Sequence, residues 1–256
     1  MTWRHLAASV TGRSHLARKE PGQDYCRAGI IQISNHEFFI GLAADGAGST
    51  VHGGIGAEIA CETLYSAIIE SLGKSPGISP VTKDEACDWI SQARGVIGER
   101  AGKDRQPMRD YACTLLGVIA RDNGAVFFQI GDGGIVINQE DSYRTVFWPD
   151  QGEYANTTFF ITDEKYLDHI RFEQSSEIPK EIAVFTDGLQ NLVLSFSQKS
   201  VHAGFFKPLF TALTQKPDNP FTGLTQHLKN LLSRTDISER SDDDKTLILA
   251  VRLPAE

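Results

Sequence analysis

The chain has few cysteines, and they lie far apart in the sequence. Four cysteines occur in 256 residues, and none forms a C-x-x-C pair. This spacing excludes the usual structural zinc signatures and a dense disulfide framework. We therefore expect buried free thiols at four positions, which are Cys26, Cys61, Cys87 and Cys113.

Basic residues and long apolar runs are also scarce. The 25 Lys and Arg residues are outnumbered by 33 Asp and Glu residues, which gives a formal net charge of -8. Binding to phosphate backbones requires clustered Lys and Arg, so we expect no nucleic-acid partner. No segment approaches the roughly 18 apolar residues of a membrane span, and residues 1–20 lack the apolar core of a signal peptide. We expect a cytoplasmic monomer with no membrane partner.

The first hundred residues alternate as strands do and then change to helical spacing. The predicted strands are residues 2–12, 25–34 and 37–45. The last two are joined by a turn at Asn35. The predicted helices are residues 53–73 and 81–103. Thr82 and Glu85 have the spacing of a capping box at the start of the second helix.

The following segment predicts a β-meander. Residues 111–139 hold two apolar runs joined at Asn123-Gly124, a strong hairpin signal, and a third strand after Gly-Asp-Gly-Gly at 131–134. Further strands are expected at 144–148, 157–162, 169–174, 178–187 and 245–253. Helical sequence extends from about residue 200 to 232, broken by Pro208 and by Lys-Pro-Asp-Asn-Pro at 216–220. This order indicates an α+β fold, an antiparallel β-sandwich flanked by helices, in one domain spanning residues 1–256.

Three predicted strands end on an aspartate that is followed by glycine: Asp45, Asp132 and Asp187. Asp-Gly pairs are typical of tight turns, and this interpretation suits Asp132, which lies between two strands. It suits Asp45 and Asp187 less well, because no returning strand follows either residue. A carboxylate at a strand end with glycine behind it leaves the neighbouring backbone carbonyl free as a second oxygen ligand.

Aspartates also precede two other predicted strands. Asp24 lies just ahead of residues 25–34, and residues 242–244 are three consecutive aspartates that alone are typical of a solvated loop. If all these strand ends converge, the repulsion between carboxylates requires cations, and an all-oxygen ligand set favours Mg²⁺ or Mn²⁺. Two such ions on a shared carboxylate lower the pKa of a bridging water. The pattern therefore indicates a metal-dependent phosphoester hydrolase.

Taken in order, these motifs resemble those of the metal-dependent PPM/PP2C Ser/Thr protein phosphatases. The similarity is greatest to the compact bacterial branch, which opens with Gly-x-Ser-His and Gln-Asp. The motifs here are GRSH (12–15), GQDYC (22–26), AADGAGS (43–49), CTLLGV (113–118), QIGDGG (129–134), FTDGL (185–189) and DDDKT (242–246). The resemblance implies two packed antiparallel sheets with helices outside, a four-layer αββα fold, and two bound Mg²⁺ or Mn²⁺ ions.

The resemblance also implies roles for the acids that carry metal binding and catalysis. Asp45 matches the aspartate that bridges the two metals, and Gly46 matches the residue that lends its carbonyl to one of them. Asp187 and Asp243 match ligands of the first metal. Asp24 matches the acid that reaches the second metal, usually through water.

Other positions match the family only in part. Asp132 matches an aspartate that helps to hold a third, weaker metal in many members, but Gly-Gly replaces the usual Ser-Arg after it. Asp244 takes the place of an Asn or Asp beside the final ligand. The family usually has an arginine before Gln-Asp that holds substrate phosphate. Here Arg18 and Lys19 flank that position, and a phosphate contact and a solvated basic turn both fit them.

The general acid is the least defined part of this resemblance. Animal relatives often carry a histidine, proposed as the acid, where this chain has Ala47. Protonation of the leaving alkoxide then falls to a metal-bound water, to His15 or to His52. His15 is also a candidate ligand for substrate phosphate.

Three functional hypotheses follow. The first is a Ser/Thr protein phosphatase in which hydroxide bridging two metals attacks phosphorus directly, with a phosphoprotein, and a Ser/Thr kinase or its target, as partners. The second is a phosphatase-like regulatory module with little turnover, suggested by the altered Gly-Asp-Gly-Gly. The third is a two-metal phosphoesterase for small molecules. Residues 190–200 follow Asp187 and are expected to form a flap that selects substrates.

Overall fold

The computed structural model describes residues 2–74, 81–139, 142–149, 158–215 and 222–254. One sheet contains β1 (Thr2–Val10), β6 (Gly134–Gln139), β7 (Ser142–Thr145), β9 (Glu181–Phe185) and β12 (Lys245–Leu253). The other contains β2 (Asp24–Ile33), β3 (His36–Asp45), β4 (Leu115–Arg121), β5 (Gly124–Ile130) and β8 (Arg171–Ser175). Their strand orders are β1-β12-β9-β6-β7 and β2-β3-β4-β5-β8, and all the neighbouring strands are antiparallel.

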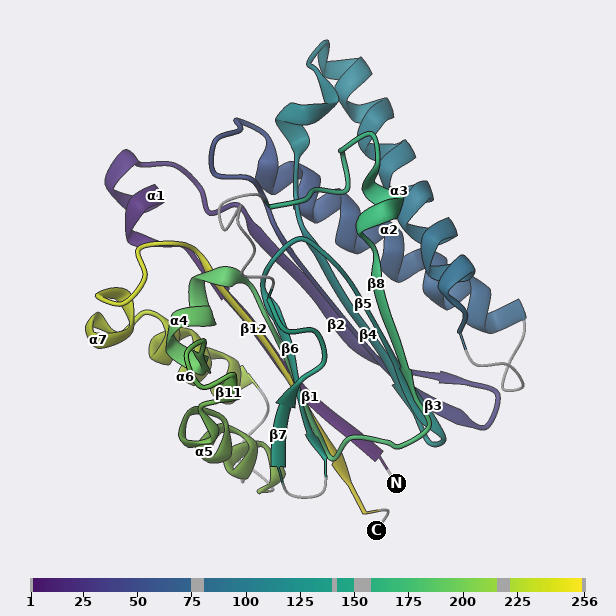
Figure 1. Ribbon diagram of the computed structural model, residues 1–256, viewed down its shortest axis with the longest axis vertical. Helices are drawn as coiled ribbons and strands as arrows, with labels where there is room; N and C mark the ends of the chain where they lie inside the picture. The colour runs from purple at the N-terminus through teal and green to yellow at the C-terminus, as the bar shows by residue number, and fades with distance from the viewer. Residues whose placement is uncertain (1, 75–80, 140–141, 150–157, 216–221, 255–256) are drawn as a thin grey trace.

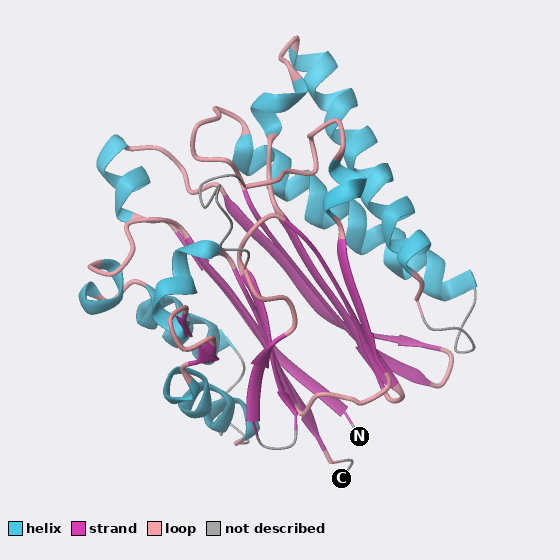
Figure 2. Cartoon of the chain, in the orientation of Figure 1, coloured by secondary structure: helices cyan, strands magenta, loops and turns pink. Residues whose placement is uncertain are grey.

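Helices cover the outer face of each sheet (Figures 1 and 2). Their bounds are α1 Arg13–Arg18, α2 Gly53–Lys74, α3 Lys83–Asp104, α4 Gln190–Val193, α5 Ala203–Thr214, α6 Thr222–Leu232 and α7 Thr235–Ser238. The pair α2 and α3 packs on the β2–β8 sheet, while α5 and α6 pack on the sheet that contains β1 and β12. A short ribbon of β10 (Leu194–Ser195) and β11 (Ser200–Val201) follows α4. The predicted sandwich with helices on both sides is confirmed.

Both faces of the central strands of each sheet are buried, which explains the continuous apolar runs in the sequence. In β3, Phe39 packs between the two sheets while Ile40 packs against the helical layer. In β12, Ile248 and Leu249 divide in the same way between the inner and outer layers. Because successive side chains of a strand point to opposite faces, a strand buried on both sides needs apolar residues at every position.

The helix predictions hold with small changes. Thr82 Oγ1 accepts a hydrogen bond from the Glu85 N–H at 3.2 Å, and Glu85 Oε2 accepts one from the Thr82 N–H at 2.8 Å, so the capping box is present. Helix α2 continues one residue past the expected end at Gly73. The predicted break at Pro208 is wrong, because this residue lies inside α5. Residues 216–220 lie outside the described residues, and α1 was not predicted.

Two strand predictions are wrong. The β-meander is not formed, because β6 leaves β5 and pairs with β9 in the other sheet. Residues 158–162 form turns and irregular backbone in place of a strand. The connection at 131–134 is therefore a crossover between the two sheets, and interpreting Asp132 as part of a hairpin turn fails.

The cysteine prediction is right for two of the four thiols. All four cysteines are free; Cys61 and Cys113 are buried, while Cys26 and Cys87 are half-buried. Cys26 lies on β2, an edge strand with one unpaired side, and Cys87 lies in the second turn of α3. In the described part of the chain, no helix combines the length and the apolar character that crossing a bilayer requires.

Candidate active site

Five aspartates from both sheets lie at the same end of the sandwich, away from the two termini (Figure 1). Asp24 begins β2 and is paired in register with Asp45, the last residue of β3. Asp132 follows β5, Asp187 follows β9, and Asp243 comes just before β12. The two packed sheets bring these strand ends together, as the pattern of the sequence predicted.

Three of these carboxylates form the centre of the site. Asp45, Asp132 and Asp187 each offer one oxygen, and these oxygens all lie within 4.8 Å of one another. The three residues are half-buried. Such an arrangement of oxygen atoms, drawn from three separate strand ends, is that of a ligand set for a hard divalent cation.

The position of Asp45 is fixed through its backbone. The Asp45 N–H donates to Thr114 Oγ1 at 3.0 Å, and the Thr114 N–H donates to the Asp45 carbonyl at 2.8 Å. Gly46 passes so close to the start of α2 that a Cβ there would lie 2.2 Å from the carbonyl carbon of Gly53. Glycine is therefore required where β3 passes toward α2.

The connection that carries Asp132 also depends on glycine. Gly131 and Gly133 have φ angles of 87° and 97°, a region that L side chains rarely adopt. Thr158 Oγ1 donates to Asp132 Oδ2 at 2.9 Å. Gln190, the first residue of the expected flap, donates to the Gly133 carbonyl at 3.0 Å. The predicted flap therefore begins beside this part of the site.

A buried threonine connects Asp24 to the first sheet. Thr186 Oγ1 donates to Asp24 Oδ2 at 2.7 Å and accepts from the Thr246 N–H at 3.0 Å. Thr186 has no exposed surface. It therefore connects β2 in one sheet to β9 and β12 in the other, next to Asp24 and Asp187.

Burial and mutual repulsion dominate the electrostatics of the site. Burial raises the pKa of Asp24 to about 7, against the lowering effect of the Thr186 hydrogen bond. Burial, together with the nearby Asp132 and Asp243, raises the pKa of Asp187 to about 7. Burial, and then the charge of Asp24, raises the pKa of Asp45 well above its ordinary value. Keeping these carboxylates ionised in the folded protein therefore costs free energy, and a bound cation would offset that cost.

In the described part of the chain, the charges of Asp243 and Asp24 act on one buried basic residue, Lys245, without forming an ion pair with it. Among the ion pairs of the described residues, none joins the five aspartates to a lysine or an arginine. Lys245 is close in sequence, but its Nζ donates to the Asp243 carbonyl at 2.6 Å. The donor set is all oxygen, half-buried and without an ion-pair partner among the described residues, which fits Mg²⁺ or Mn²⁺.

Comparison with known proteins identifies the family. The family model described as Protein phosphatase 2C matches residues 11–233. The chain belongs to the protein phosphatase 2C family. It is 35% identical over 253 residues to Serine/threonine-protein phosphatase 3 of Escherichia coli (strain K12), covering 98% of this chain and 99% of that protein. The family predicted from the motifs is therefore confirmed.

Solved structures show the phosphatase 2C fold across the whole chain. The Ser/Thr phosphatase Stp1 from Staphylococcus aureus aligns over 99% of this chain and 96% of its own, with a TM-score of 0.63 and 13% identity. The catalytic domain of the Ser/Thr protein phosphatase PstP, solved in complex with two manganese ions, covers 97% of both chains, with a TM-score of 0.60 and 13% identity.

The residues expected to bind substrate phosphate are not gathered at the acids of this phosphatase 2C site. Arg18 is half-exposed, and its Nε lies 2.6 Å from Glu20 Oε2. Lys19 is exposed and ends α1 with a φ of 58°. Arg18 and Asp24 do line one cleft of about 620 Å³, and the other four aspartates do not line it. The role of both cations stays a prediction.

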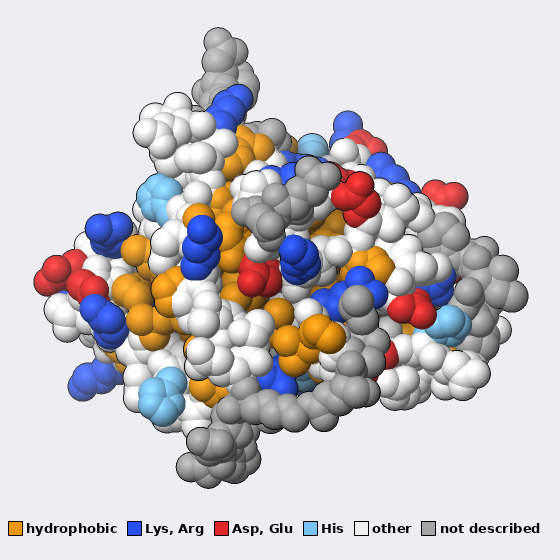
Figure 3. All heavy atoms as spheres, turned by 90° about the horizontal axis from the view of Figure 1, so that it is seen from below, with side chains coloured by type: hydrophobic (Ala, Val, Ile, Leu, Met, Phe, Trp, Pro, Cys, Tyr) orange, Lys and Arg blue, Asp and Glu red, His pale blue; other side chains and the backbone are white. Residues whose placement is uncertain are grey.

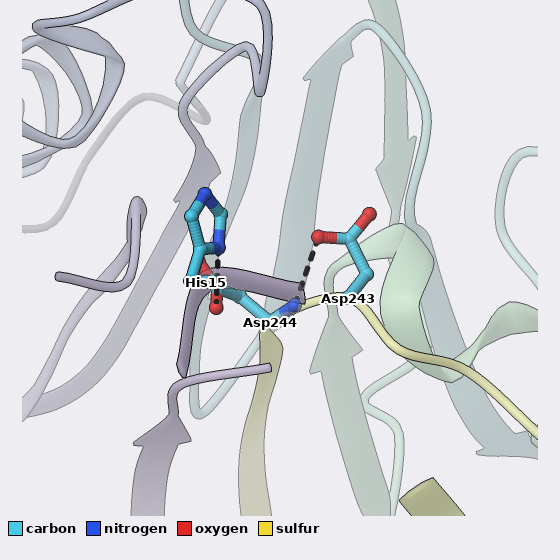
Figure 4. A group of neighbouring side chains, drawn as sticks. All are labelled: His15, Asp243 and Asp244. Atoms are coloured by element: carbon cyan, nitrogen blue, oxygen red, sulfur yellow. Dashed lines mark hydrogen bonds and ion pairs between the residues drawn. The ribbon is translucent and has the colours of Figure 1, made fainter. Parts of the chain in front are cut away.

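The two candidate histidines occupy different surroundings. His15 is 3% exposed, and its Nδ1 lies 3.1 Å from Asp244 Oδ1 (Figure 4). His52 is half-buried and stacks on Tyr111, with the ring centroids 4.9 Å apart. These placements favour packing or positioning roles over proton transfer.

Sequence reasoning missed the polar residues that hold the acids. Thr114, Thr158 and Thr186 each bond to one of the five aspartates. Thr114 and Thr186 stand inside two of the quoted motifs, next to apolar strand residues, which was the available signal. Thr158 has no such signal, because its contact depends on the path of a loop.

Proposed function

We propose that this member of the phosphatase 2C family is a metal-dependent phosphoprotein phosphatase that hydrolyses phosphoserine and phosphothreonine esters. The observation that carries the proposal is the trio Asp45, Asp132 and Asp187, whose oxygens lie within 4.8 Å of one another without a basic partner among the described residues. The name of the Escherichia coli relative supports the activity, and the manganese ions of PstP support the cofactor.

The proposed ligands follow the positions of the acids. Asp45 would contact two cations, with the Gly46 carbonyl as a further ligand, because it lies at the centre of the cluster. Asp187 and Asp243 would hold the first cation and Asp24 the second. Asp132, bonded to Thr158, would help to hold a third. Bound divalent cations would supply activation of water near neutral pH and neutralisation of the phosphate charge.

The chain itself would keep these ligands in place. Thr114 fixes the backbone of Asp45, and Thr186 fixes the carboxylate of Asp24. The arginine at position 18, on the cleft that also borders Asp24, would orient the phosphoryl group. We place this activity in one cytoplasmic domain acting as a monomer on phosphoproteins, the products of a Ser/Thr kinase.

Phosphate release tests the proposal directly. Hydrolysis of p-nitrophenyl phosphate and of a phosphothreonine peptide would be measured with Mn²⁺ and with EDTA for the native protein, Asp187→Asn and Asp122→Asn. Asp122 lies at the opposite end of the sandwich. Metal charge stabilisation is worth several kcal/mol, so we expect Asp187→Asn to lose at least about 100-fold in rate. Asp122→Asn should retain native turnover.

The outcomes separate the three functional hypotheses. Manganese-dependent release from both substrates, with preference for the peptide, supports the protein phosphatase. Preference for the small ester supports a small-molecule phosphoesterase. Folded native protein that binds Mn²⁺ without turnover supports the regulatory module, which the Gly-Gly after Asp132 favours.

A further inference from the structure

The Asp244 side chain is a buried carboxylate that accepts three hydrogen bonds. Its Oδ1 accepts from the Gly12 N–H at 2.6 Å and lies 3.1 Å from His15 Nδ1, and its Oδ2 accepts from the Gln23 N–H at 2.5 Å. Asp244 is 2% exposed and His15 is 3% exposed. These charge-assisted bonds offset the cost of burying the carboxylate.

The three donors belong to one segment of the chain. Gly12 and Gln23 are the two ends of residues 12–23, which contain α1, so a single side chain closes this segment into a loop. The Ser14 N–H donates to the Asp242 carbonyl at 2.9 Å. A Cβ on Gly12 would lie 2.3 Å from the Asp243 carbonyl carbon, so the two backbones are in direct contact.

Proposed metal ligands stand on both sides of this contact. Asp24 directly follows Gln23, and Asp243 directly precedes Asp244. Figure 4 shows the His15 ring standing over the Asp244 carboxylate, with the Asp243 carboxylate directed to the other side. Asp243 Oδ1 accepts from the Asp244 N–H at 2.8 Å. The position of Asp244 therefore affects both ligand-bearing segments.

The His15 side chain is placed to fix the Asp244 carboxylate, and it has no other hydrogen bond among the described residues. Its Nε2 is buried without a hydrogen-bond partner in the described part of the chain. Burying Nε2 without a partner costs free energy. The hydrogen-bond contact of the ring that can offset this cost is the one between Nδ1 and Asp244. The group His15, Asp243 and Asp244 is compact enough for a metal ion, but both Asp244 oxygens already accept N–H donors.

We infer that His15 and Asp244 are a positioning pair that sets the spacing between Asp24 and Asp243. The inference rests on the proposed function for the roles of those two acids. His15 orients the Asp244 carboxylate, and Asp244 binds both ends of residues 12–23. This arrangement fixes the positions of Asp24 and Asp243 relative to each other. Residues that orient metal ligands typically change metal affinity 10- to 100-fold when altered.

The chain contains a matched control. His36 Nδ1 lies 3.1 Å from Asp122 Oδ2, which is the same distance as in the buried pair, and these side chains are 35% and 54% exposed. This pair joins two hairpin ends at the opposite end of the sandwich. Its loss should affect neither metal binding nor the exchange of residues 12–23.

The experiment compares His15→Leu, His15→Asn and His36→Leu with the native protein. Mn²⁺ affinity would be measured by titration calorimetry, amide hydrogen exchange of residues 12–23 by mass spectrometry, and kcat and KM for p-nitrophenyl phosphate at saturating Mn²⁺. We expect His15→Leu to weaken Mn²⁺ binding on the order of 10-fold and to speed exchange. It should lower kcat more than it changes KM. His15→Asn keeps a nitrogen donor near the position of Nδ1 and should restore most of each property.

Each outcome decides the inference. Native affinity and exchange in His15→Leu would overturn it, as would a folded His15→Asn that is as impaired as His15→Leu, since shape alone would then matter. If His15→Leu does not fold, His15→Asn and Asp244→Asn replace it, and native values in Asp244→Asn overturn the inference. If the native protein binds no Mn²⁺, the proposed function fails, and the exchange measurement alone decides whether the pair holds the segment.

Discussion

The two ends of the sandwich use the same residue types for different purposes. At one end, Asp-Gly pairs lie at or just after the ends of β3, β5 and β9, and their aspartates form the cluster of Asp45, Asp132 and Asp187. At the other end, Asp122, Asn123 and Gly124 simply turn β4 into β5, with Gly124 at a φ of 155°. Figure 3 shows that end from below, where acidic side chains lie apart from one another among basic and apolar ones.

The difference lies in which strands the connections join. Each hairpin at the far end closes a pair of strands within one sheet, β2 with β3 and β4 with β5. At the site end, the connection through Asp132 crosses between the sheets, and Asp45 and Asp187 end strands of different sheets. Where connections from both sheets meet, the carboxylates lie close enough together to form a site. Where a hairpin connects two strands of one sheet, they serve only as turn residues.

The largest contrast is expected from removing one charge at each end. Asp45→Asn should reduce Mn²⁺-dependent phosphate release at least about 100-fold. It should also raise the melting temperature of the EDTA-treated protein at pH 8, because a buried carboxylate with a raised pKa is no longer ionised. Phosphate release and calorimetry measure both effects. A variant that is inactive and also less stable without metal would contradict this account, and Asp122→Asn should change neither property.

Glycine replacements sharpen the comparison sterically. Gly46→Ala should cost about 1–3 kcal/mol of unfolding free energy and most of the activity, because its Cβ would meet the Gly53 backbone at 2.2 Å. Gly124→Ala should cost a similar free energy, since its Cβ would lie 2.6 Å from the Ser175 carbonyl oxygen. The activity of the folded Gly124→Ala fraction should be native. Urea unfolding and phosphate release measure both.

Gly48 provides the control for these replacements. No atom lies within 4 Å of a Cβ built on Gly48, although it is two residues from Gly46. Gly48→Ala should therefore keep native stability and turnover. Equal losses in Gly46→Ala and Gly48→Ala would contradict the steric explanation.

Threonine replacements test the hydrogen bonds behind the acids. Thr186→Val removes the donor to Asp24 and the acceptor for the Thr246 N–H, and should cost about 2 kcal/mol. This corresponds to a fall of roughly 4–8 °C in melting temperature. At the far end, exposed Thr2 donates to Glu37 at 3.0 Å, and Thr2→Val should stay within about 0.5 kcal/mol. Similar losses of unfolding free energy in Thr186→Val and Thr2→Val would contradict the expected difference between the two ends.

The sequence predicted what local pattern determines. Alternation and continuous apolar runs marked the strands of both sheets, and Thr82 with Glu85 marked the start of α3. The aspartates stood out because carboxylates at the ends of buried strands are unusual. Their convergence was inferred from charge and from the family motifs, and the packing of two sheets produces it.

The sequence did not predict what depends on tertiary contacts. Nothing local distinguishes the crossover at Asp132 from a hairpin, because both use glycines at positive φ. Pro208 was expected to break a helix, yet α5 continues through it and buries Phe206 and Phe210 on either side of it in the sequence. The place of His15 was missed because its partner, Asp244, is 229 residues away.

A pH dependence of stability is also expected for the protein without metal. Asp24 and Asp187 have folded pKa values of about 7, raised by burial, while an unfolded aspartate titrates near about 4. Between these pH values the folded protein keeps protons that the unfolded chain has released. The contribution of these groups to stability is therefore full below pH 4, falls as the pH rises to about 7, and levels off above it.

Calorimetry of EDTA-treated protein from pH 5 to pH 8 checks this prediction. Other groups also titrate, so the comparison is with Asp187→Asn, whose melting temperature should fall less over the same range. Because cations bind the ionised carboxylates, Mn²⁺ should raise the melting temperature of the native protein more at pH 8 than at pH 5. If the melting temperature changes equally with pH in the native protein and in Asp187→Asn, the Asp187 carboxylate does not destabilise the metal-free protein, and the prediction is wrong.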